Sequence, residues 1–339
     1  MSALFSPLQI KSLSLKNRLV VSPMCQYSAQ DGLANDWHLV HLGSFAVGGA
    51  GLIITEATAV SPEGCISNAD IGLWNDEQVA PLKRITSFIE AQGGLAGVQL
   101  AHAGRKAKCG MGVIGPSAIP FKDGEPMPLE MSADQITQVI QDFKAAAVRA
   151  LKAGFKVIEI HAAHGYLIHS FLSPLSNHRT DNYGGSFANR TRLLLEIVRQ
   201  VNEVWPKDLP IFVRISSTDW VDNGWNVHDS IALAALLKGL GVDLIDCSTG
   251  GNVAGATIPV GPLYQLKFAT DIKKASGILT GAVGMITTAE QGEKIIQSQE
   301  ADLVFMGREF LRNPFFPLQA AKALKVEVKW PVQYERARG

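Results

Sequence analysis

Two histidines and a tyrosine follow an apolar run in the segment VIEIHAAHGY, residues 157–166. β-Branched residues dominate the start of this segment, which is typical of a buried strand. His161, His164 and Tyr166 are therefore expected just beyond a strand end. Imidazoles donate hydrogen bonds or bind metal ions, and a phenol with an ordinary pKa of about 10 keeps its proton at neutral pH. The group can stabilise a developing negative charge and supply a proton.

Zinc binding is the main alternative for the two histidines. The spacing HxxH permits two ligands, and Glu159 or His102 can supply a third. However, the chain has no HExxH segment, and its first apolar run is not followed by HxH. We therefore prefer hydrogen-bond donation, with no metal. Histidines satisfied only by backbone carbonyls are a third interpretation, which the adjacent tyrosine makes less attractive.

Eight short apolar runs alternate with helical patterns along the chain. Runs of this kind are typical of parallel strands that are buried on both faces. Strand–helix alternation repeated eight times predicts an α/β fold, a (β/α)8 TIM barrel that forms a single domain over residues 1–339. The runs begin at Arg18, Gly51, Ala96, Lys156, Pro210, Asp243, Gly277 and Asp302.

Two of the helices have clear boundaries in the sequence. Residues 132–135 read SADQ, a capping box, and Gly154 is expected to stop the helix that follows. A second helix is expected to end at Gly241. The buried face of the first should contain Ile136, Val139, Ile140, Phe143, Ala147, Ala150 and Leu151. That of the second should contain Ile231, Ala234, Ala235, Leu237 and Leu240.

Glycine-rich turns follow the last two apolar runs, TGAVG at 280–284 and MGRE at 306–309. In such barrels, functional groups lie at the carboxyl ends of the strands, and phosphate often binds between these two loops. Because glycines let backbone N–H groups approach a ligand, we predict a phosphate site at Gly284, Gly307 and Arg308. The segment GMGVIG at 110–115 also matches GxGxxG. Prolines follow it where a helix should begin, so we predict a surface loop there.

Composition excludes several classes of protein. The 339 residues are 47% hydrophobic and include 31 basic and 31 acidic side chains, so no broad basic surface for nucleic acid is expected. No apolar run is long enough for a signal peptide or a membrane span. The four cysteines form no CxxC pair. We expect a cytoplasmic protein with neither nucleic-acid nor membrane partners.

Long, ordered motifs make the chain resemble the old yellow enzyme family over nearly its whole length. Cys25 and the HxxH pair are similar to those of the thermophilic-like subgroup of ene-reductases, close to bacterial NADPH dehydrogenases and xenobiotic reductases. The short glycine-rich loop at 108–115 departs from the family pattern. The motifs are SPMCQYS (22–28), QLAHAGRKA (99–107), EIHAAHGYL (159–167), SPLSNHRTDNYGGS (173–186), TGAVGMI (280–286) and FMGRE (305–309).

The resemblance implies FMN, held without a covalent bond, and NADPH or NADH as the hydride donor. Arg214 would contact the polar edge of the flavin ring, and Gly284, Gly307 and Arg308 would hold the phosphate. The other implied cofactor-binding residues would line or contact the ring. The full set is Ser22, Pro23, Met24, Cys25, Ala57, Gln99, Arg214, Gly284, Gly307 and Arg308.

The implied activity is a ping-pong reduction of the C=C bond in α,β-unsaturated carbonyl and related electron-poor compounds. Tyr166 would donate a proton, His161 and His164 would donate hydrogen bonds to the carbonyl oxygen, and Cys25 would adjust the flavin. Tyr27 and Lys106 would join the histidines in facing the substrate. A zinc-dependent barrel hydrolase that uses His161 and His164 and a non-catalytic flavin-binding protein are the alternatives.

The C-terminal tail, residues 329–339, comes too late to belong to the barrel. Its start, KWPVQY, is too apolar for a free tail, and aromatic-rich ends usually dock on a surface. In the subgroup that the chain resembles, this tail inserts an arginine into the active site of a neighbouring subunit. We therefore expect a homodimer, or a dimer of dimers as a homotetramer, in which Arg336 completes the neighbour's substrate pocket.

Overall fold

The computed structural model describes residues 2–110 and 112–338, and eight of its strands close into a parallel barrel. Each barrel strand pairs with the strands that precede and follow it in the chain, and β12 returns to β3 to close the ring. The predicted (β/α)8 barrel and all eight predicted strands are confirmed. The strands are β3 (Leu19–Val21), β4 (Leu52–Ala59), β5 (Leu95–Ala101), β8 (Val157–Ala162), β9 (Ile211–Ser216), β10 (Leu244–Ser248), β11 (Leu279–Ala282) and β12 (Leu303–Met306).

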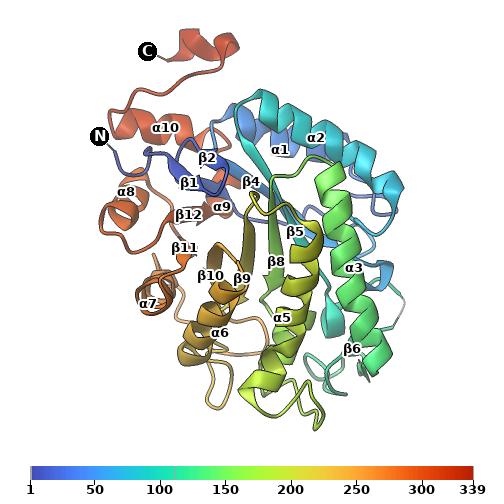
Figure 1. Cartoon of the computed structure of the whole chain (residues 1–339). Helices are drawn as coiled ribbons and strands as arrows, with labels where there is room; N and C mark the ends of the chain where they lie inside the picture. The colour runs from blue at the N-terminus through green and yellow to red at the C-terminus, as the bar shows by residue number, and fades with distance from the viewer. Residues whose placement is uncertain (1, 111, 339) are drawn as a thin grey trace.

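A helix follows each barrel strand and returns the chain to the start of the next one, so that the helices surround the barrel (Figure 1). The main helices are α1 (Asp36–Val47), α2 (Val79–Ala91), α3 (Ala133–Lys152), α5 (Phe187–Val204), α6 (Val227–Gly239), α7 (Leu266–Ser276), α8 (Ala289–Gln297) and α10 (Phe316–Ala323). Two short helices, α4 (Leu167–Leu172) and α9 (Arg308–Arg312), begin directly at barrel mouth loops.

The predicted helix boundaries are confirmed in both helices. Ser132 caps α3 by accepting a hydrogen bond from the Gln135 backbone, and the Gln135 side chain completes the capping box. Gly154 and Gly241 follow α3 and α6 with positive φ angles of 86° and 85°, which glycine adopts without strain. Two of the predicted buried positions, Leu151 and Ala235, are wrong because both side chains are exposed. Each lies at the edge of the apolar face, where the helix turns toward solvent.

Apolar side chains form two layers on either side of the barrel wall. Inside the barrel, Val20, Leu52 and Phe212 pack with residues of a small antiparallel hairpin, β1 (Leu8–Ile10) and β2 (Leu13–Leu15). A larger cluster fills the space between the strands and the helices. The apolar residues of the inner layer occupy the amino-terminal half of the barrel, which leaves the carboxyl ends of the strands for polar groups.

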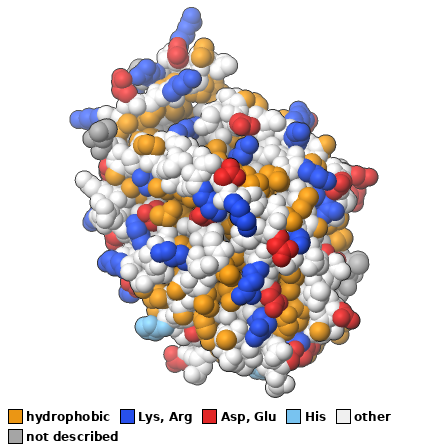
Figure 2. Space-filling view, viewed as in Figure 1, with side chains coloured by type: hydrophobic (Ala, Val, Ile, Leu, Met, Phe, Trp, Pro, Cys, Tyr) orange, Lys and Arg blue, Asp and Glu red, His pale blue; other side chains and the backbone are white. Residues whose placement is uncertain are grey.

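The remaining segments are loops and short turns. In the described residues, no helix directly follows the GxGxxG match, as predicted, but its last two residues form a short strand, β6 (Ile114–Gly115), which pairs with β7 (Leu129–Glu130). The predicted surface position is wrong in part, because Val113 and Gly115 are buried. The tail ends in a 3-10 helix, η4 (Val332–Ala337), beyond α10 (Figure 1). Acidic and basic side chains are mixed over the face seen in Figure 2. No helix among the described residues is long and apolar enough to cross a membrane.

Candidate active site

Polar side chains from four consecutive strands meet inside the barrel near its carboxyl end. Strand register places Gln99 beside Glu159, and Arg214 beside both His161 and Asp246. The Gln99 Nε2 donates to Glu159 Oε1 at 2.8 Å, and the Arg214 Nε lies 3.0 Å from Asp246 Oδ2. All of these side chains are buried. These five side chains form a buried polar layer, called the polar floor below, which a ligand at the barrel mouth can contact.

Two carboxyl groups of this floor hold their protons unusually tightly. Burial, together with the charge of Asp246, raises the pKa of Glu159 to about 8, although the nearby Arg214 opposes the shift. Burial raises the pKa of Asp246 to about 6, again against the effect of Arg214. Since one guanidinium cannot fully compensate two buried carboxylates, the floor carries a proton on Glu159 at neutral pH.

The two histidines of HAAHGY form a directed chain of hydrogen bonds. His161 Nδ1 accepts from the Ala163 backbone at 3.2 Å, so the neutral ring carries its proton on Nε2. This Nε2 lies 3.3 Å from His164 Nδ1, and His164 Nε2 lies 2.8 Å from Ser248 Oγ. Burial, followed by the charge of Arg214, lowers the pKa of both rings well below the ordinary value. Both histidines are therefore neutral donors at neutral pH.

A strained turn presents His164 and Tyr166 to the barrel mouth. His164 has a φ of 60° and Gly165 a φ of 75°, both in the left-handed region. A Cβ on Gly165 would lie 2.3 Å from the Gly251 carbonyl oxygen, so only glycine fits there. Lys106 Nζ joins the two loops by donating to the carbonyls of His164 and Gly251 at 2.9 and 3.0 Å. The lysine predicted to face the substrate therefore also holds the turn in place.

His169 and Asp219 hold the backbone of the same turn. The sequence alone assigned no role to either residue. His169 Nδ1 accepts from the Gly165 backbone at 2.9 Å, and its Nε2 lies 3.1 Å from Asp219 Oδ1. Both side chains are fully buried. Burial alone would raise the pKa of Asp219, but the charge and hydrogen bond of His169 hold it below the ordinary value. The sequence offered one indication of this support, a third histidine eight residues after His161.

Tyr166 lies against the first histidine and the lysine. Its ring meets that of His161 edge to face at 5.0 Å between centroids, and Lys106 Nζ lies 5.2 Å from its ring centroid. Burial, with smaller effects from Cys25 and Tyr27, raises the pKa of Tyr166 above the ordinary value. For Lys106, burial has the opposite effect and lowers the pKa to about 8, because the charged form of lysine is the protonated one. The phenol is therefore fully protonated at neutral pH, as a proton donor must be.

Cys25 lies in the loop that follows the first barrel strand, β3. Ala57 and Tyr27 are near enough to the sulfur to act against the rise in its pKa, but they do not offset burial. Burial, followed by the charges of Glu56 and Asp70, raises the pKa of Cys25 to about 12. A neutral thiol of this kind is a weak nucleophile, which fits a role beside a cofactor. Tyr27 itself is 55% exposed and open to a ligand.

The two glycine-rich loops lie next to each other because β11 and β12 are paired. Gly284 has a φ of 123°, and Gly307 precedes α9. A Cβ on Gly307 would lie 3.4 Å from Met24 Sδ, so this loop also meets the loop of Cys25. Burial raises the pKa of Tyr264, and the charges of Arg308 and Arg214 both oppose that shift, so Tyr264 lies near both arginines. The glycines, the exposed Arg308 and the polar floor together fit an elongated ligand with a phosphate at one end, as FMN has.

Metal ligands do not gather at this site. In the described ranges, no group of three or more His, Cys, Asp or Glu side chains is placed to hold a metal ion. His102, one of the proposed third ligands, instead accepts a hydrogen bond from the Gly104 backbone at 3.0 Å. Glu159, the other, is bonded to Gln99. The zinc alternative therefore lacks a third ligand.

Arg336 is the one predicted site residue that lies apart from the others. It is exposed on η4, which projects beyond α10 at the end of the tail (Figure 1). Within the described chain, the end of the tail bonds to the segment that precedes it: Arg338 pairs with Glu327, at 3.1 Å, and not with the barrel mouth. The remaining predicted residues lie on the mouth loops, on the barrel strands that lead into them, or on η3 (Gly104–Lys106).

Solved structures with the same barrel include two related enzymes. Morphinone reductase superposes with a TM-score of 0.83 at 29% sequence identity, covering 97% of this chain and 91% of that one. The old yellow enzyme homologue from Zymomonas mobilis gives a TM-score of 0.82 at 30% identity, covering 97% and 94%. The protein therefore has the fold of the old yellow enzyme barrels.

Sequence comparison agrees with this fold. Residues 3–327 match the NADH:flavin oxidoreductase / NADH oxidase family. NADPH dehydrogenase of Bacillus subtilis (strain 168) is 52% identical over 335 residues, and NADPH dehydrogenase of Listeria innocua is 52% identical over 339 residues. These alignments cover 98% and 99% of both partners, respectively. The chain belongs to the NADH:flavin oxidoreductase family, which includes the old yellow enzymes, as its motifs predicted.

Proposed function

We propose that the protein is an FMN-dependent NADPH dehydrogenase that reduces the C=C bond of α,β-unsaturated carbonyl compounds. The observation that carries this proposal is the neutral pair His161 and His164 beside the protonated Tyr166. Hydrogen-bond donors and a proton donor at one mouth are what reduction of a conjugated carbonyl requires. Family membership supports the flavin, and the names of the two bacterial relatives support NADPH rather than NADH as donor.

The residues at the mouth fit FMN held without a covalent bond. Gly284, Gly307 and Arg308 would hold its phosphate, while Arg214 and Gln99 would contact the polar edge of the ring. Ser22, Pro23, Met24, Cys25 and Ala57 would line the ring. When bound, the flavin would accept a hydride from the nicotinamide and pass it to the alkene. The protein supplies placement, exclusion of water and stabilisation of charge.

The histidine pair would stabilise the negative charge that grows on the carbonyl oxygen. In the ligand-free protein, the Nε2 protons of His161 and His164 are directed at His164 and Ser248. A carbonyl oxygen would take over these donors, and one such donor contributes about 3–4 kcal/mol to transition-state stabilisation. Since both rings are neutral, the site favours an oxygen that gains charge during the reaction over a ligand that is already anionic.

Tyr166 would protonate the alkene carbon that does not receive the hydride. Its raised pKa keeps the phenol protonated until the substrate carbanion requires the proton. Lys106, with a pKa of about 8, retains most of its charge at neutral pH beside the ring and stabilises the phenolate as it forms.

Comparing the two half-reactions tests this proposal. Under anaerobic conditions, NADPH should reduce the yellow protein, and an enone should reoxidise it. Y166F should slow reoxidation by the enone by about 100-fold or more and leave reduction by NADPH unchanged, because only the alkene needs a proton at carbon. A quinone acceptor is the control and should reoxidise the variant at the normal rate. Equal loss in both half-reactions would remove Tyr166 from the proton-donor role.

The same experiment separates the alternatives. A non-catalytic flavin-binding protein would be yellow but would not lose its colour with NADPH. A zinc hydrolase would be colourless and would contain stoichiometric zinc by metal analysis. If NADPH reduced the flavin and no enone reoxidised it, the protein would be a flavin dehydrogenase that uses another class of electron acceptor.

We also propose that the tail joins two copies of the chain, with Arg336 entering the neighbour's substrate pocket. The exposed Val332 and Tyr334, 74% and 41% accessible, lie two residues apart on the tail and support a docking role, because exposed apolar side chains that cluster mark interaction sites. A groove of about 750 Å³ lies where the tail leaves the barrel, lined in part by Phe5, Val47 and Trp330. A second copy is the occupant that this groove would take.

A further inference from the structure

The backbone N–H groups of the loop that carries Cys25 have few hydrogen-bond acceptors, although side chains of Asn35 and Trp37 donate to Ser28 and Gln26 from the start of α1. Between Ser22 and Ser28 there is no regular secondary structure, and Tyr27 has a strained φ of 51°. Ser22 N–H donates to the Met306 carbonyl at 3.0 Å and fixes the start of the loop. Beyond that point, and up to Ser28, Gln26 is the only described residue whose backbone N–H donates a hydrogen bond. It donates to Oε2 of Glu56 at 2.9 Å.

A β-bulge in β4 places Glu56 for this contact. Ile54 pairs with Gly97 and Ala57 with Gln99, so β4 contains one extra residue over this interval. Paired residues of parallel strands face the same side, and both Ile54 and Ala57 therefore face the barrel interior. The bulge turns the intervening Glu56 outward, toward α1, which is a common use of a bulge beside an active site. Ala57 is left facing inward, near Cys25.

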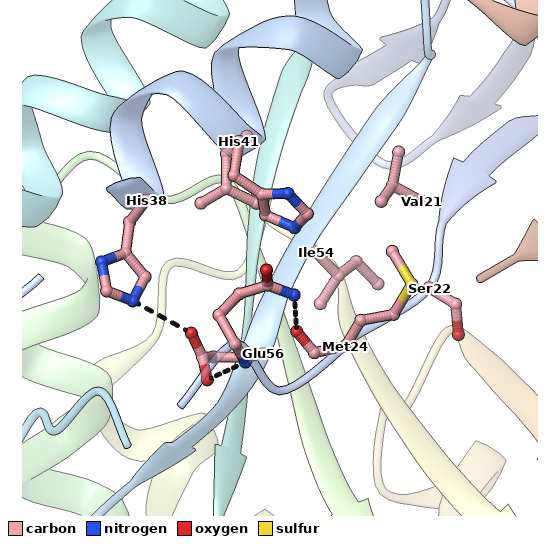
Figure 3. Close-up of a pocket in the computed structure, with 9 residues that line it drawn as sticks. Val21, Ser22, Met24, His38, His41, Ile54 and Glu56 are labelled. Atoms are coloured by element: carbon pink, nitrogen blue, oxygen red, sulfur yellow. Dashed lines mark hydrogen bonds and ion pairs between the residues drawn. The ribbon is translucent and has the colours of Figure 1, made fainter. Parts of the chain in front are cut away.

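His38 of α1 holds the other carboxylate oxygen. Its Nδ1 accepts the Asn35 backbone N–H at 3.1 Å and lies 3.0 Å from Asn35 Oδ1, so Asn35 fixes the orientation of the ring. The His38 Nε2 lies 3.2 Å from Glu56 Oε1, and neither atom has a closer polar partner among the described residues. Figure 3 shows His38 and Glu56 facing each other, with Met24 on the far side of the carboxylate. Both side chains are at most 3% exposed.

The surroundings of Glu56 leave it no alternative position. The cavity between Val21, Leu42 and Glu56 has a volume of about 10 Å³, about the least that one water molecule needs. His41 lines the same cavity, and burial, followed by the charge of His38, lowers its pKa to about 4, so it is neutral. No cation therefore competes with His38 and Gln26 for the carboxylate within this cavity.

We propose that Glu56, oriented by His38, is a positioning residue that holds the loop of Cys25 and so sets how the thiol acts on the bound flavin. This proposal rests on the flavin placement given above. The acidic and phenolic groups that face Cys25 are Glu56, Asp70, Tyr27 and Tyr166. Removing the charge of Glu56 should therefore act on the thiol, as well as loosening the loop.

The first measurement concerns the thiol and does not depend on turnover. The holoprotein is alkylated with iodoacetamide at several pH values, and modification of the Cys25 peptide is followed by mass spectrometry. E56Q removes a charge that raises the pKa of Cys25, so its alkylation profile should move to lower pH. Each unit of that move raises the thiolate fraction at a given pH about tenfold. E77Q, which removes an exposed carboxylate on η2 (Asp76–Gln78), is the matched control and should leave the profile unchanged.

The second measurement is a double-mutant cycle on the flavin midpoint potential. If Glu56 acts through Cys25, E56Q should shift the potential in the wild-type background and add nothing to C25A. H38Q should produce a shift in the same direction as E56Q, because it frees the carboxylate that holds Gln26. It also serves as the second variant if E56Q loses its flavin.

Additive shifts of E56Q and C25A would overturn the proposal, because they would mean that the carboxylate acts on the flavin directly. An unchanged alkylation profile in both E56Q and H38Q would overturn it as well. Failure of the proposed alkene reduction alone would not affect either measurement, so the two proposals fail separately.

Discussion

Replacing Glu159 with glutamine should change how stability depends on pH. Glu159 is fully buried, and its pKa is raised from an ordinary 4.5 to about 8. Between these values, the folded protein keeps a proton that the unfolded chain releases. The free energy of unfolding therefore falls as pH rises through this interval, by at most about 1.4 kcal/mol per pH unit for one proton. Glutamine has no proton to hold, and E159Q should lose this slope.

The geometry favours a clean substitution. Glu159 Oε1 accepts from Gln99 Nε2, and a glutamine carbonyl can accept the same bond. The second oxygen, Oε2, has no hydrogen-bond partner among the described residues, so its replacement by an amide breaks no bond. We therefore expect E159Q to be as stable as wild type near pH 4.5 and more stable by a few kcal/mol at pH 8 and above.

Chemical denaturation at saturating FMN, repeated from pH 4.5 to 9, measures this difference. E77Q is the control, since that carboxylate is exposed and should follow wild type at every pH. Infrared spectra provide an independent check: a protonated carboxyl band present at pH 6 in wild type should be missing in E159Q. Parallel stability curves for wild type and E159Q, with no missing band, would show that Glu159 is ionised and refute the reasoning.

A second substitution tests the cause of the shift. The charge of Asp246 is the largest contribution after burial to the raised pKa of Glu159. D246N removes that charge and frees Arg214 to act on Glu159 alone, so the pKa of Glu159 should fall. The stability curve of D246N should then flatten at a lower pH than that of wild type. A plateau that stays near pH 8 would assign the shift to burial alone.

Two further predictions concern the ligand pocket and the tail. Replacing His161 and His164 together with alanine should weaken binding of phenols, whose oxygen resembles the charged carbonyl, by at least tenfold per lost donor in a flavin titration; unchanged affinity would contradict the hydrogen-bond role. Truncation after Lys329 should loosen the dimer in sedimentation and raise the KM for both NADPH and enones while FMN content stays constant. Unchanged assembly and kinetics would show that Arg336 serves no neighbouring site.

Local patterns were sufficient to predict the barrel. Each apolar run is a buried strand, and α1, α3, α6 and α8 begin at capping boxes that residues close in sequence define. Such signals depend only on side chains close in sequence. The same is true of the HAAHGY turn, where Gly165 and the polar rings follow their strand directly. The wrong positions, Leu151 and Ala235, lie at the margins of helical faces, where neighbouring elements decide which residue is covered.

Motif order was sufficient to identify the family but not the connections among its residues. The roles of His169 and Asp219 depend on a contact between segments fifty residues apart. The high pKa of Glu159 results from burial and from the carboxylate of Asp246 on another strand, against the opposing effect of Arg214. Neither is visible until strand register places these side chains in one buried layer, where charge is costly and each partner matters.

Glu56 shows most clearly which features the sequence determines and which depend on the tertiary structure. The sequence by itself determined that a carboxylate follows a buried strand, and alternation along that strand would direct it into the barrel with Ile54. Only the tertiary structure contains the bulge against β5, because a bulge is a mismatch between two strands and not a property of one. That single extra residue turns Glu56 outward to His38 and Gln26. The sequence thus determined the barrel and the chemical groups at its mouth, while strand register decided which of those groups face the ligand and which hold the others in place.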